Sequence, residues 1–395
     1  MKLTLRFSIA SLLLASVFTG KVSYAQLPSP APAHIVVLWE ENYAYTQIIG
    51  SSYAPNINAF VGDPHAAVFT QFFAIEHPSQ PNYIDFFSGA NQGLVTDDFP
   101  TTDGLTIPFT TPNLAAELLA AGKTFKTFSE DLPSVGSDVA TYTSGGANYA
   151  RKHNPCTNWV GTAANQFSDT LNQPFTNFPV AANYSSLPTV SFVVPNMTND
   201  MHDGSYPSNI TVGDTWMNSH LSSLKTWALD NNTLYIIIYD EDDDLHGNNI
   251  PVVFYGGMVK GGTYTENVNF YNLLRSIEDM YSLTHAGSAA TATPITDCWQ
   301  SITGLGVNNT VNKNLSFTIV PNPASDIVTF NCNIPLTSQA TITVTDITGR
   351  IAGKYTMTGT SLQVNTSAYV QGIYSYAISD RSGKINDGKF VIAHN

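Results

Sequence analysis

The sequence is poor in cysteine, with only three in 395 residues. A small scaffold held by disulfides is therefore excluded, because that class needs several cysteine pairs in a short chain. Cys156, Cys298 and Cys332 have no Cys or His neighbour at the spacing of structural zinc sites, so a cysteine-based zinc site is not expected. Cys156 and Cys298 could still pair in an oxidising compartment.

Basic residues are also scarce. Lysine and arginine number 16 against 30 aspartates and glutamates, which gives a formal charge of −14. A nucleic-acid partner is not expected, since binding a polyphosphate backbone requires a basic surface. An enzyme for a small phosphate ester remains compatible, because a bound metal ion can reverse the local charge. Charged residues make up 12% and hydrophobic ones 43%, a globular composition that excludes global disorder.

Long apolar segments are missing except near the N-terminus, where basic residues precede the apolar stretch 7–18. Small Ser23 and Ala25 then stand at the −3 and −1 positions of a cleavage site, so residues 1–25 are predicted to be a signal peptide. The apolar stretch is shorter than the ~20 residues of a membrane span. We therefore expect no integral membrane span, and a retained anchor is the alternative.

Residues 26–303 show the pattern of an α/β domain. Short apolar runs without alternation predict strands buried on both faces of a sheet, and apolar stripes between them predict helices. We expect a doubly wound, mostly parallel sheet. One stripe spans residues 216–227, and Asp214 is placed to cap the start of that helix. The strand candidates are His34–Trp39, Thr124–Phe128, Thr189–Val194, Leu234–Tyr239 and Pro251–Tyr255.

The amino-acid composition and the hydrophobic pattern change after residue 303. Gly, Asn and Thr dominate residues 304–314, which we predict to be a linker. Short alternating runs broken by turn residues follow in residues 315–395 and predict a small all-β sandwich.

Polar side chains that can bind metal follow three of the predicted strands. Glu40, Glu41 and Asn42 follow the first, and the segments Asp200–Asp203 and Asp240–His246 follow two others. In open α/β sheets ligands bind outside the carboxyl ends of the strands, so neighbouring parallel strands would bring these clusters into one crevice. So many carboxylates cannot all stay ionised there without a cation. The sequence therefore predicts one or two divalent metal ions, with Mn, Zn, Fe, Mg and Ca all compatible with oxygen and imidazole ligands.

A candidate nucleophile lies in the segment His77-Pro-Ser-Gln-Pro-Asn-Tyr83. A helical stripe begins at Tyr83, which places Ser79 at or near a helix N-terminus, where backbone N–H groups and the helix dipole favour an anion. A metal-bound serine alkoxide that attacks a phosphate would gain from both. An ordinary serine N-cap is the alternative interpretation.

The segments His34–Asn42, His77–Tyr83 with Ser88-Gly89, Asp200–Gly204 and Asp240-Glu241 resemble, in this order, the phosphoesterase family. That family holds secreted acid phosphatases and non-haemolytic phospholipases C and belongs to the alkaline phosphatase superfamily. The resemblance spans about residues 34–283. It implies a doubly wound sheet and hydrolysis of phosphate esters through a phosphoserine intermediate.

The resemblance also implies roles for single residues. Ser79 becomes the nucleophile, and His202 becomes a further catalytic residue that either binds a second metal, together with His246, or contacts the phosphate. The family commonly has Asp-His where this chain has Leu245-His246. The implied metal ligands are Glu41, Asn42, Asp240, Glu241 and His246, and the implied substrate-binding residues are His77, Asn82, Lys152, His153 and Asp203.

The segments Pro321–Asp326, Asp346–Gly349, Gly372–Tyr374 and Gly388–Val391 resemble the C-terminal sorting domain of type IX secretion in Gram-negative bacteria. This resemblance implies that the chain uses that secretion machinery as a partner. It also implies export across both membranes, followed by release or attachment at the cell surface. An immunoglobulin-like accessory module is the alternative.

Taken together, the sequence favours a secreted, metal-dependent phosphomonoesterase of the acid phosphatase type that acts on a small phosphate ester. The second hypothesis is a phospholipase C or another phosphodiesterase, which would need an apolar surface beside the crevice. The third is a non-catalytic surface protein that binds phosphate or glycan, a class that has no need to combine Ser79 with acidic clusters. The candidates for the apolar surface are Phe72, Phe73, Phe86 and Phe87.

Overall fold

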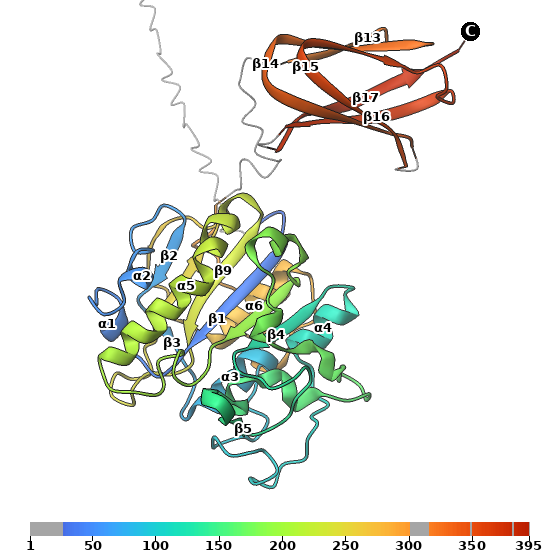
Figure 1. The fold of residues 1–395 in the computed structure, drawn as a ribbon. Coiled ribbons are helices and arrows are strands. Elements are labelled where there is room, and N and C mark those ends of the chain that lie inside the picture. The colour runs from blue at the N-terminus through green and yellow to red at the C-terminus, as the bar shows by residue number, and fades with distance from the viewer. Residues whose placement is uncertain (1–26, 301–315, 348–349, 381–382, 395) are drawn as a thin grey trace, which may run out of the picture.

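The structure, a computed structural model, describes residues 27–300, 316–347, 350–380 and 383–394. The predicted signal peptide, residues 1–25, and the predicted linker, residues 304–314, lie outside the described residues. The described residues form an α/β domain and a separate β domain (Figure 1).

An eight-stranded sheet in the order β11-β2-β10-β9-β1-β8-β4-β7 is the centre of the α/β domain. Central β1 is parallel to both of its neighbours, β8 and β9, and β10 runs antiparallel to β9 and β2. The predicted doubly wound, mostly parallel sheet is confirmed, and all five strand candidates are present. The sheet strands are β1 (His34–Glu40), β2 (Ala66–Phe69), β4 (Phe125–Ser129), β7 (Asn172–Pro174), β8 (Val190–Val194), β9 (Thr233–Tyr239), β10 (Val252–Tyr255) and β11 (Gly262–Tyr264).

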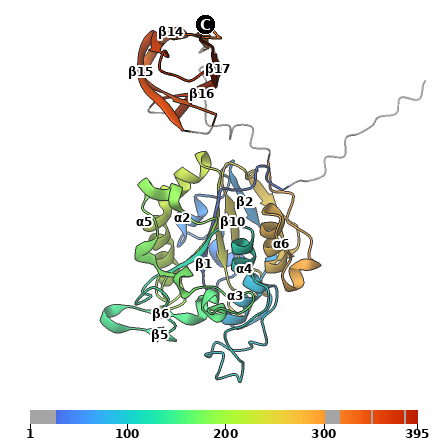
Figure 2. The same cartoon turned by 90° about the vertical axis from the view of Figure 1, so that its right-hand side faces the viewer.

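Helices cover both faces of this sheet (Figures 1 and 2). The long helix α5 lies on one face with α2, and α3, α4 and α6 lie on the other. The helices are α1 (Tyr45–Ile48), α2 (Pro55–Asn58), α3 (Ser79–Ser88), α4 (Leu114–Ala120), α5 (Ser208–Asp230) and α6 (Phe270–Met280). Two small ladders pair β3 (Phe72–Phe73) with β12 (Val268–Asn269) and β5 (Thr141–Tyr142) with β6 (Tyr149–Ala150). Short 3₁₀ helices occupy Ser144–Gly146, Arg151–His153, Pro155–Trp159, Asp169–Leu171, Phe175–Asn177, Ala181–Ser186 and Gly287–Ala290.

The predicted capping role of Asp214 is wrong. Helix α5 begins at Ser208, so Asp214 lies inside the helix and is buried. Its carboxylate instead accepts the backbone N–H groups of Asn56, at 3.1 Å, and Ile57, at 2.8 Å, at the start of α2. An acidic side chain therefore caps a helix that is distant in sequence, which a local pattern does not reveal.

Aromatic side chains bind α3 to the sheet. The Trp39 ring of β1 lies 4.5 Å from that of Tyr83 and 5.3 Å from that of Phe86, measured between centroids. Phe72, Phe86 and Phe87 are all fully buried in this core. They therefore do not form the apolar surface that a lipid substrate would need. The three cysteines are free and buried, so Cys156 and Cys298 are not paired.

The β domain is an antiparallel, curled sheet of five strands that comes close to closing on itself (Figure 2). Its strands are β13 (Phe317–Val320), β14 (Ile327–Thr345), β15 (Ile351–Asn365), β16 (Gly372–Asp380) and β17 (Gly383–Ile392). Strand β14 contains two alternating segments, residues 327–330 and 340–345, and register shifts lie between them. No helix among the described residues has the length and apolar composition needed to cross a bilayer.

A glycine at the end of α3 predicts a specific stability effect. Gly89 has a φ of 71°, and an added Cβ would collide with the backbone carbonyl of Ala286. We expect Gly89→Ala to lower the free energy of unfolding by about 2–4 kcal/mol, from the left-handed conformation and the clash together. Gly62 also has a positive φ, of 82°, but open space around it, so Gly62→Ala should cost about 1–2 kcal/mol. Equal losses in urea unfolding would contradict this account.

A buried pair of carboxyl groups predicts a pH-dependent stability. Burial raises the pKa of Glu278 to about 8, with repulsion from Glu117 adding to the effect. Because the folded state holds this proton more tightly than the unfolded chain, the free energy of unfolding falls as pH rises from about 4.3 to about 8. Glu278→Gln removes the free-energy cost of ionising a buried carboxyl group. The amide oxygen of the new side chain can still accept the N–H of Ala286, which donates to Glu278 at 2.8 Å.

We expect Glu278→Gln to stabilise the protein at pH 9 and to have little effect at pH 5, measured by chemical denaturation. Asp279→Asn is the control, because Asp279 is partly exposed and pairs with Arg275 at 2.8 Å. Asp279→Asn should not increase the free energy of unfolding at pH 9. A Glu278→Gln gain of the same size at both pH values would show that ionisation is not the cause.

Candidate active site

The three polar clusters predicted from the sequence meet at one edge of the sheet. Strands β8, β1 and β9 are adjacent and parallel, so their carboxyl ends point the same way. Asp240 accepts the backbone N–H of Asn42 at 3.2 Å, and the N–H of Glu41 donates to the carbonyl of Asp200 at 2.8 Å. These contacts tie the end of β1 to the segments that follow both neighbouring strands.

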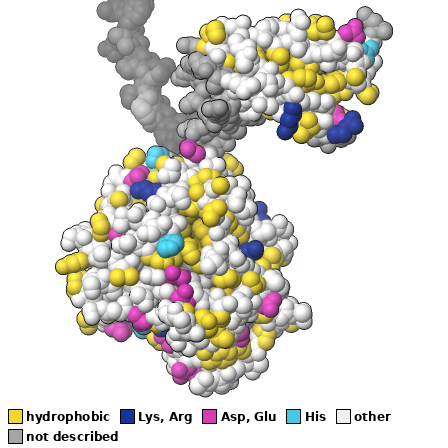
Figure 3. Space-filling model, in the orientation of Figure 1, with side chains coloured by type: hydrophobic (Ala, Val, Ile, Leu, Met, Phe, Trp, Pro, Cys, Tyr) yellow, Lys and Arg dark blue, Asp and Glu magenta, His cyan; other side chains and the backbone are white. Residues whose placement is uncertain are grey.

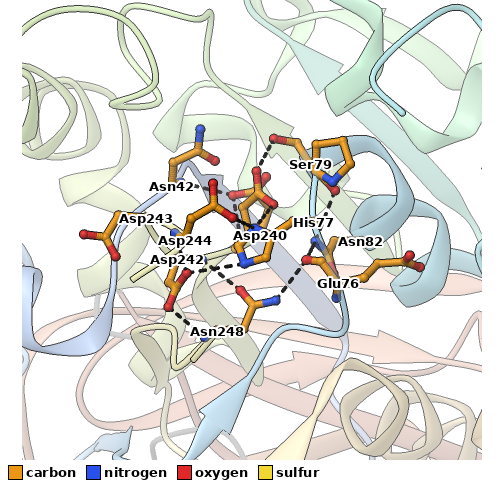
Figure 4. Close-up of polar contacts among 12 residues, drawn as sticks. Asn42, Glu76, His77, Ser79, Asn82, Asp240, Asp242, Asp243, Asp244 and Asn248 are labelled. Carbon is orange, nitrogen blue, oxygen red and sulfur yellow. Dashed lines mark hydrogen bonds and ion pairs between the residues drawn. The ribbon is translucent and has the colours of Figure 1, made fainter. Parts of the chain in front are cut away.

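Ser79 is the first residue of α3 and is buried against this edge. Its Oγ lies 3.0 Å from Oε1 of Glu241 and 3.2 Å from Oε2 of Glu41. Figure 4 shows the Ser79 side chain beside the group of acidic side chains that includes Asp240. The hydroxyl is therefore held by two carboxyl groups that come from the ends of two different strands.

Asn82 fixes the turn that carries Ser79. Its side-chain oxygen accepts the N–H groups of Ile75, at 3.0 Å, and Glu76, at 3.1 Å, and its amide donates to the carbonyl of Glu76 at 2.7 Å (Figure 4). The side chain is fully buried. The structure thus places the Asn82 side chain against the backbone of the turn before Ser79, whereas the family resemblance implies a substrate contact.

The carboxyl groups around Ser79 repel one another. Burial, together with repulsion from Asp240, raises the pKa of Glu241 to about 9. Burial also raises the pKa of Glu41 well above its ordinary value, with Asp240 and Asp200 adding repulsion. The folded state can hold these four buried acids together only if protons or a cation neutralise their charge. The four are Glu41, Asp200, Asp240 and Glu241.

His153 lies between two acids of this cluster and does not itself supply positive charge. It stacks on Tyr83, and its two ring nitrogens lie 3.2 Å from Oε2 of Glu41 and 3.2 Å from Oδ2 of Asp200. Burial, Lys152 and His202 lower the pKa of His153 well below its usual range. A neutral imidazole has one N–H group and one nitrogen lone pair. It can therefore donate a hydrogen bond to one of these carboxylates, while its lone pair faces the other.

The side chains present fit a divalent cation. Among the described residues, several buried side-chain atoms at this edge have no hydrogen-bond partner, and all are oxygens or nitrogens that bind metal. Glu41, His153 and Asp200 are close enough to hold one ion between them. The unpartnered atoms are Asn42 Oδ1, His153 Nε2, Asp200 Oδ2 and Asp240 Oδ2.

Lys152 and His202 lie on the other side of the cluster. Lys152 Nζ is 3.3 Å from Nε2 of His202 and 2.7 Å from Asp97. Burial alone would lower the pKa of Lys152, but Glu41 and Asp97 outweigh it and raise the pKa. Asp203 orients His202 by a contact of 2.9 Å to Nδ1. The pair can therefore present positive charge and a proton donor to an anion.

The two remaining predicted histidines both contact the acidic loop after β9: His77 from the segment before α3, and His246 from within the loop. His77 Nδ1 lies 2.6 Å from Glu241 and its Nε2 lies 3.4 Å from Asp242. His246 is exposed and pairs with Asp243 at 2.6 Å. The structure thus places His77 next to a predicted metal ligand, whereas His246 contacts none of the side chains that touch Ser79.

Three further residues contribute to the site that were not among the ligands and substrate contacts implied by the family resemblance. Asp200 contacts His153, the Tyr83 hydroxyl donates to Glu41, and Asp97 accepts the backbone N–H of Gln80 at 2.9 Å while also binding Lys152. Asp200 and Tyr83 lie inside the motifs noted above, so a signal was present for them. Asp97 lies in a loop that carries no such pattern.

Comparison with known proteins identifies the family of this chain. The model of the Phosphoesterase family matches residues 63–284. The chain belongs to the Phosphoesterase family. It is therefore a hydrolase that acts on phosphate esters, as the named relatives also indicate. The model of the secretion system C-terminal sorting domain matches residues 318–393, which agrees with the resemblance found in the β domain.

The relatives are phosphatases. A phosphatidylinositol-3-phosphatase of Mycobacterium tuberculosis is 45% identical over 294 residues, which cover 74% of this chain and 91% of that protein. A phosphate-repressible acid phosphatase of Penicillium chrysogenum is 31% identical over 56% of this chain and 53% of its own length. The chain thus spans about half the length of that fungal relative. A solved structure of an alkaline phosphatase superfamily protein from Vibrio parahaemolyticus has a TM-score of 0.47 and 11% identity over 93% of this chain and 84% of that one.

Proposed function

We propose that this member of the Phosphoesterase family is a secreted, metal-dependent phosphomonoesterase in which Ser79 is the nucleophile. The observation that carries the proposal is the position of the Ser79 hydroxyl, held between Glu41 and Glu241 within a cluster of buried acids. A serine activated in this way suits attack on phosphorus.

Two groups of side chains would hold divalent cations. The first group consists of Asn42, Asp240 and Glu241. The second group consists of Glu41, His153 and Asp200, and Glu41 lies between the two groups. A bound cation supplies Lewis acidity: it stabilises the serine alkoxide and the charge on the phosphoryl oxygens. Glu41 or Glu241 lies close enough to take the Ser79 proton.

Lys152 and His202 would act on the phosphate and the leaving group. Lys152 provides a fixed positive charge for the phosphoryl oxygens, a contribution that is large in a site sheltered from water. His202, oriented by Asp203, donates a proton to the departing alcohol oxygen in the first step. In the second step it removes a proton from the water that hydrolyses the phosphoserine.

The names of the relatives favour a monoesterase over a diesterase, since each describes removal of a phosphate group. Of the four phenylalanines considered for the apolar surface that a phospholipase C would need, Phe72, Phe86 and Phe87 are buried in the core and Phe73 is half-buried. A non-catalytic phosphate-binding protein would not need a serine hydroxyl between two carboxyl groups. The sorting domain supports export through the secretion machinery, with the enzyme acting outside the cell or at its surface.

The nucleophile is tested by Ser79→Ala. We expect kcat on p-nitrophenyl phosphate to fall by at least about 10³-fold with the thermal unfolding temperature preserved. Ser88→Ala is the matched control, because Ser88 is buried in the same helix and its hydroxyl contacts the carbonyl groups of Ile84 and Ala90. It should retain activity. A phosphoserine trapped by acid quenching in the wild type, and absent in Ser79→Ala, would identify the intermediate directly. Turnover by Ser79→Ala would exclude this mechanism.

The cation is tested by chelation and readdition. EDTA treatment should abolish activity and lower the unfolding temperature, because the buried acids then lose their counter-charge. A metal at 100 times its Kd should restore about 2.7 kcal/mol of stability. Asp240→Asn should diminish this gain, whereas Asp169→Asn, at an exposed position, should not. Full activity in metal-free protein, verified by mass spectrometry, would contradict metal dependence.

A further inference from the structure

Two cavities lie beside the contact between Lys152 and His202: His202 lines one of them and Lys152 lines the other. One has a volume of about 540 Å³, and Asn42, His202 and the acidic segment Glu241–Asp244 line it. The other has a volume of about 330 Å³, and Gln80, Asp97, Phe99 and Lys152 are among its lining residues. Because Lys152 and His202 are 3.3 Å apart, a phosphate held by both residues would have one cavity on each side.

The smaller cavity has the character of a binding pocket for an organic group. Phe99 and Met197 contribute apolar side chains, and Asp97, Gln80 and Lys152 form its border with the catalytic residues. Its volume lies at the lower end of the range for small-molecule sites, which are mostly apolar with a few polar groups. The larger cavity is lined by acids and is therefore suited to water and cations.

The Phe99 ring is held in place. The Arg151 guanidinium lies over the ring at 4.4 Å and pairs with Asp138. This cation–π contact fixes an aromatic surface at low entropic cost to a ligand that packs on it. A fixed aromatic side chain in a small cavity favours flat, apolar groups, which gain most from contact with a ring.

The charges of the smaller cavity disfavour a second phosphate. Arg151 is paired with Asp138, and Lys152 with Asp97. Asp98 adds a negative charge to the same lining. No unpaired cation thus remains among the described residues that line this cavity. The surface of the α/β domain has a similar charge balance: on the face shown in Figure 3, acidic side chains are spread over the domain and basic side chains are few.

We infer that the smaller cavity binds the alcohol portion of the substrate, and that it selects uncharged groups with a flat apolar face over groups that carry a second phosphate. This inference rests on the proposed phosphomonoesterase activity and adds its substrate class. Phe99 is the residue that determines this preference.

Four esters test the inference. Benzyl phosphate and glycerol 2-phosphate both release an alcohol, so that a difference between them reflects binding of the organic part more than leaving-group chemistry. Fructose 1,6-bisphosphate and inositol 1,3-bisphosphate carry the second phosphate. We expect the wild-type kcat/KM to be at least about tenfold higher for benzyl phosphate than for either bisphosphate, since loss of apolar contact and added repulsion act together.

Phe99→Ala should raise KM for benzyl phosphate about tenfold with little change in kcat, because the contact is made equally in the ground and transition states. Its kcat/KM for glycerol 2-phosphate should change less than about threefold. Tyr206→Ala is the matched control: Tyr206 is 64% exposed and lines the larger cavity. Phe99→Leu serves if Phe99→Ala fails to fold, and it should show the same selectivity to a smaller degree.

Three results would overturn the inference while leaving the proposed function intact. These are equal loss on both monophosphates in Phe99→Ala, a selective loss in Tyr206→Ala instead, or a wild-type preference for a bisphosphate. A metal-loaded wild type that hydrolyses none of the four esters would instead refute the proposed function itself. Inhibition by benzylphosphonate and methylphosphonate provides an independent readout, with Phe99→Ala expected to weaken the first about tenfold and the second little.

Discussion

The repulsion between buried carboxyl groups is the constraint on which the rest of this structure depends. Glu41, Asp200, Asp240 and Glu241 are all buried at the carboxyl ends of three adjacent strands. Burial and mutual repulsion oppose their ionisation, so the fold is strained there unless positive charge is supplied. A bound cation would relieve this repulsion, and in the proposed mechanism it would also activate the serine that lies in the same cluster.

The sequence predicted the sheet and the meeting of the clusters because both follow from local patterns. Apolar runs such as 34–39 and 234–239 are typical of strands buried on both faces, and parallel neighbours bring their carboxyl ends together. Strand β2 and the edge strands β7 and β11 were missed. The edge strands are short and have no apolar run, and β2 is an apolar run of only four residues. In the β domain, β15 was missed because most of its residues are exposed or half-buried and its pattern is polar.

The roles of individual site residues depend on contacts that no local pattern contains. His153 lies between Glu41 and Asp200 because β1 and the loop after β8 meet there, and the sequence offered it as a phosphate contact. Asn82 lies in the most specific motif, yet its amide is used entirely by the backbone around Glu76. Motif membership therefore identified the segments that matter, and geometry separates the side chains that face the substrate from those that hold the backbone.

The contacts of Asp97 connect the residues proposed to carry out the reaction with those proposed to select the substrate. Asp97 accepts the N–H of Gln80, directly after Ser79, and also binds Lys152, which contacts His202. A single loop acid thus connects the start of the nucleophile's helix, the cation that would hold the phosphate and the wall of the smaller cavity. Because loops vary more readily than strands, changes around Asp97 and Phe99 would alter which alcohols bind while the strand-end acids, and with them the chemistry, stay the same.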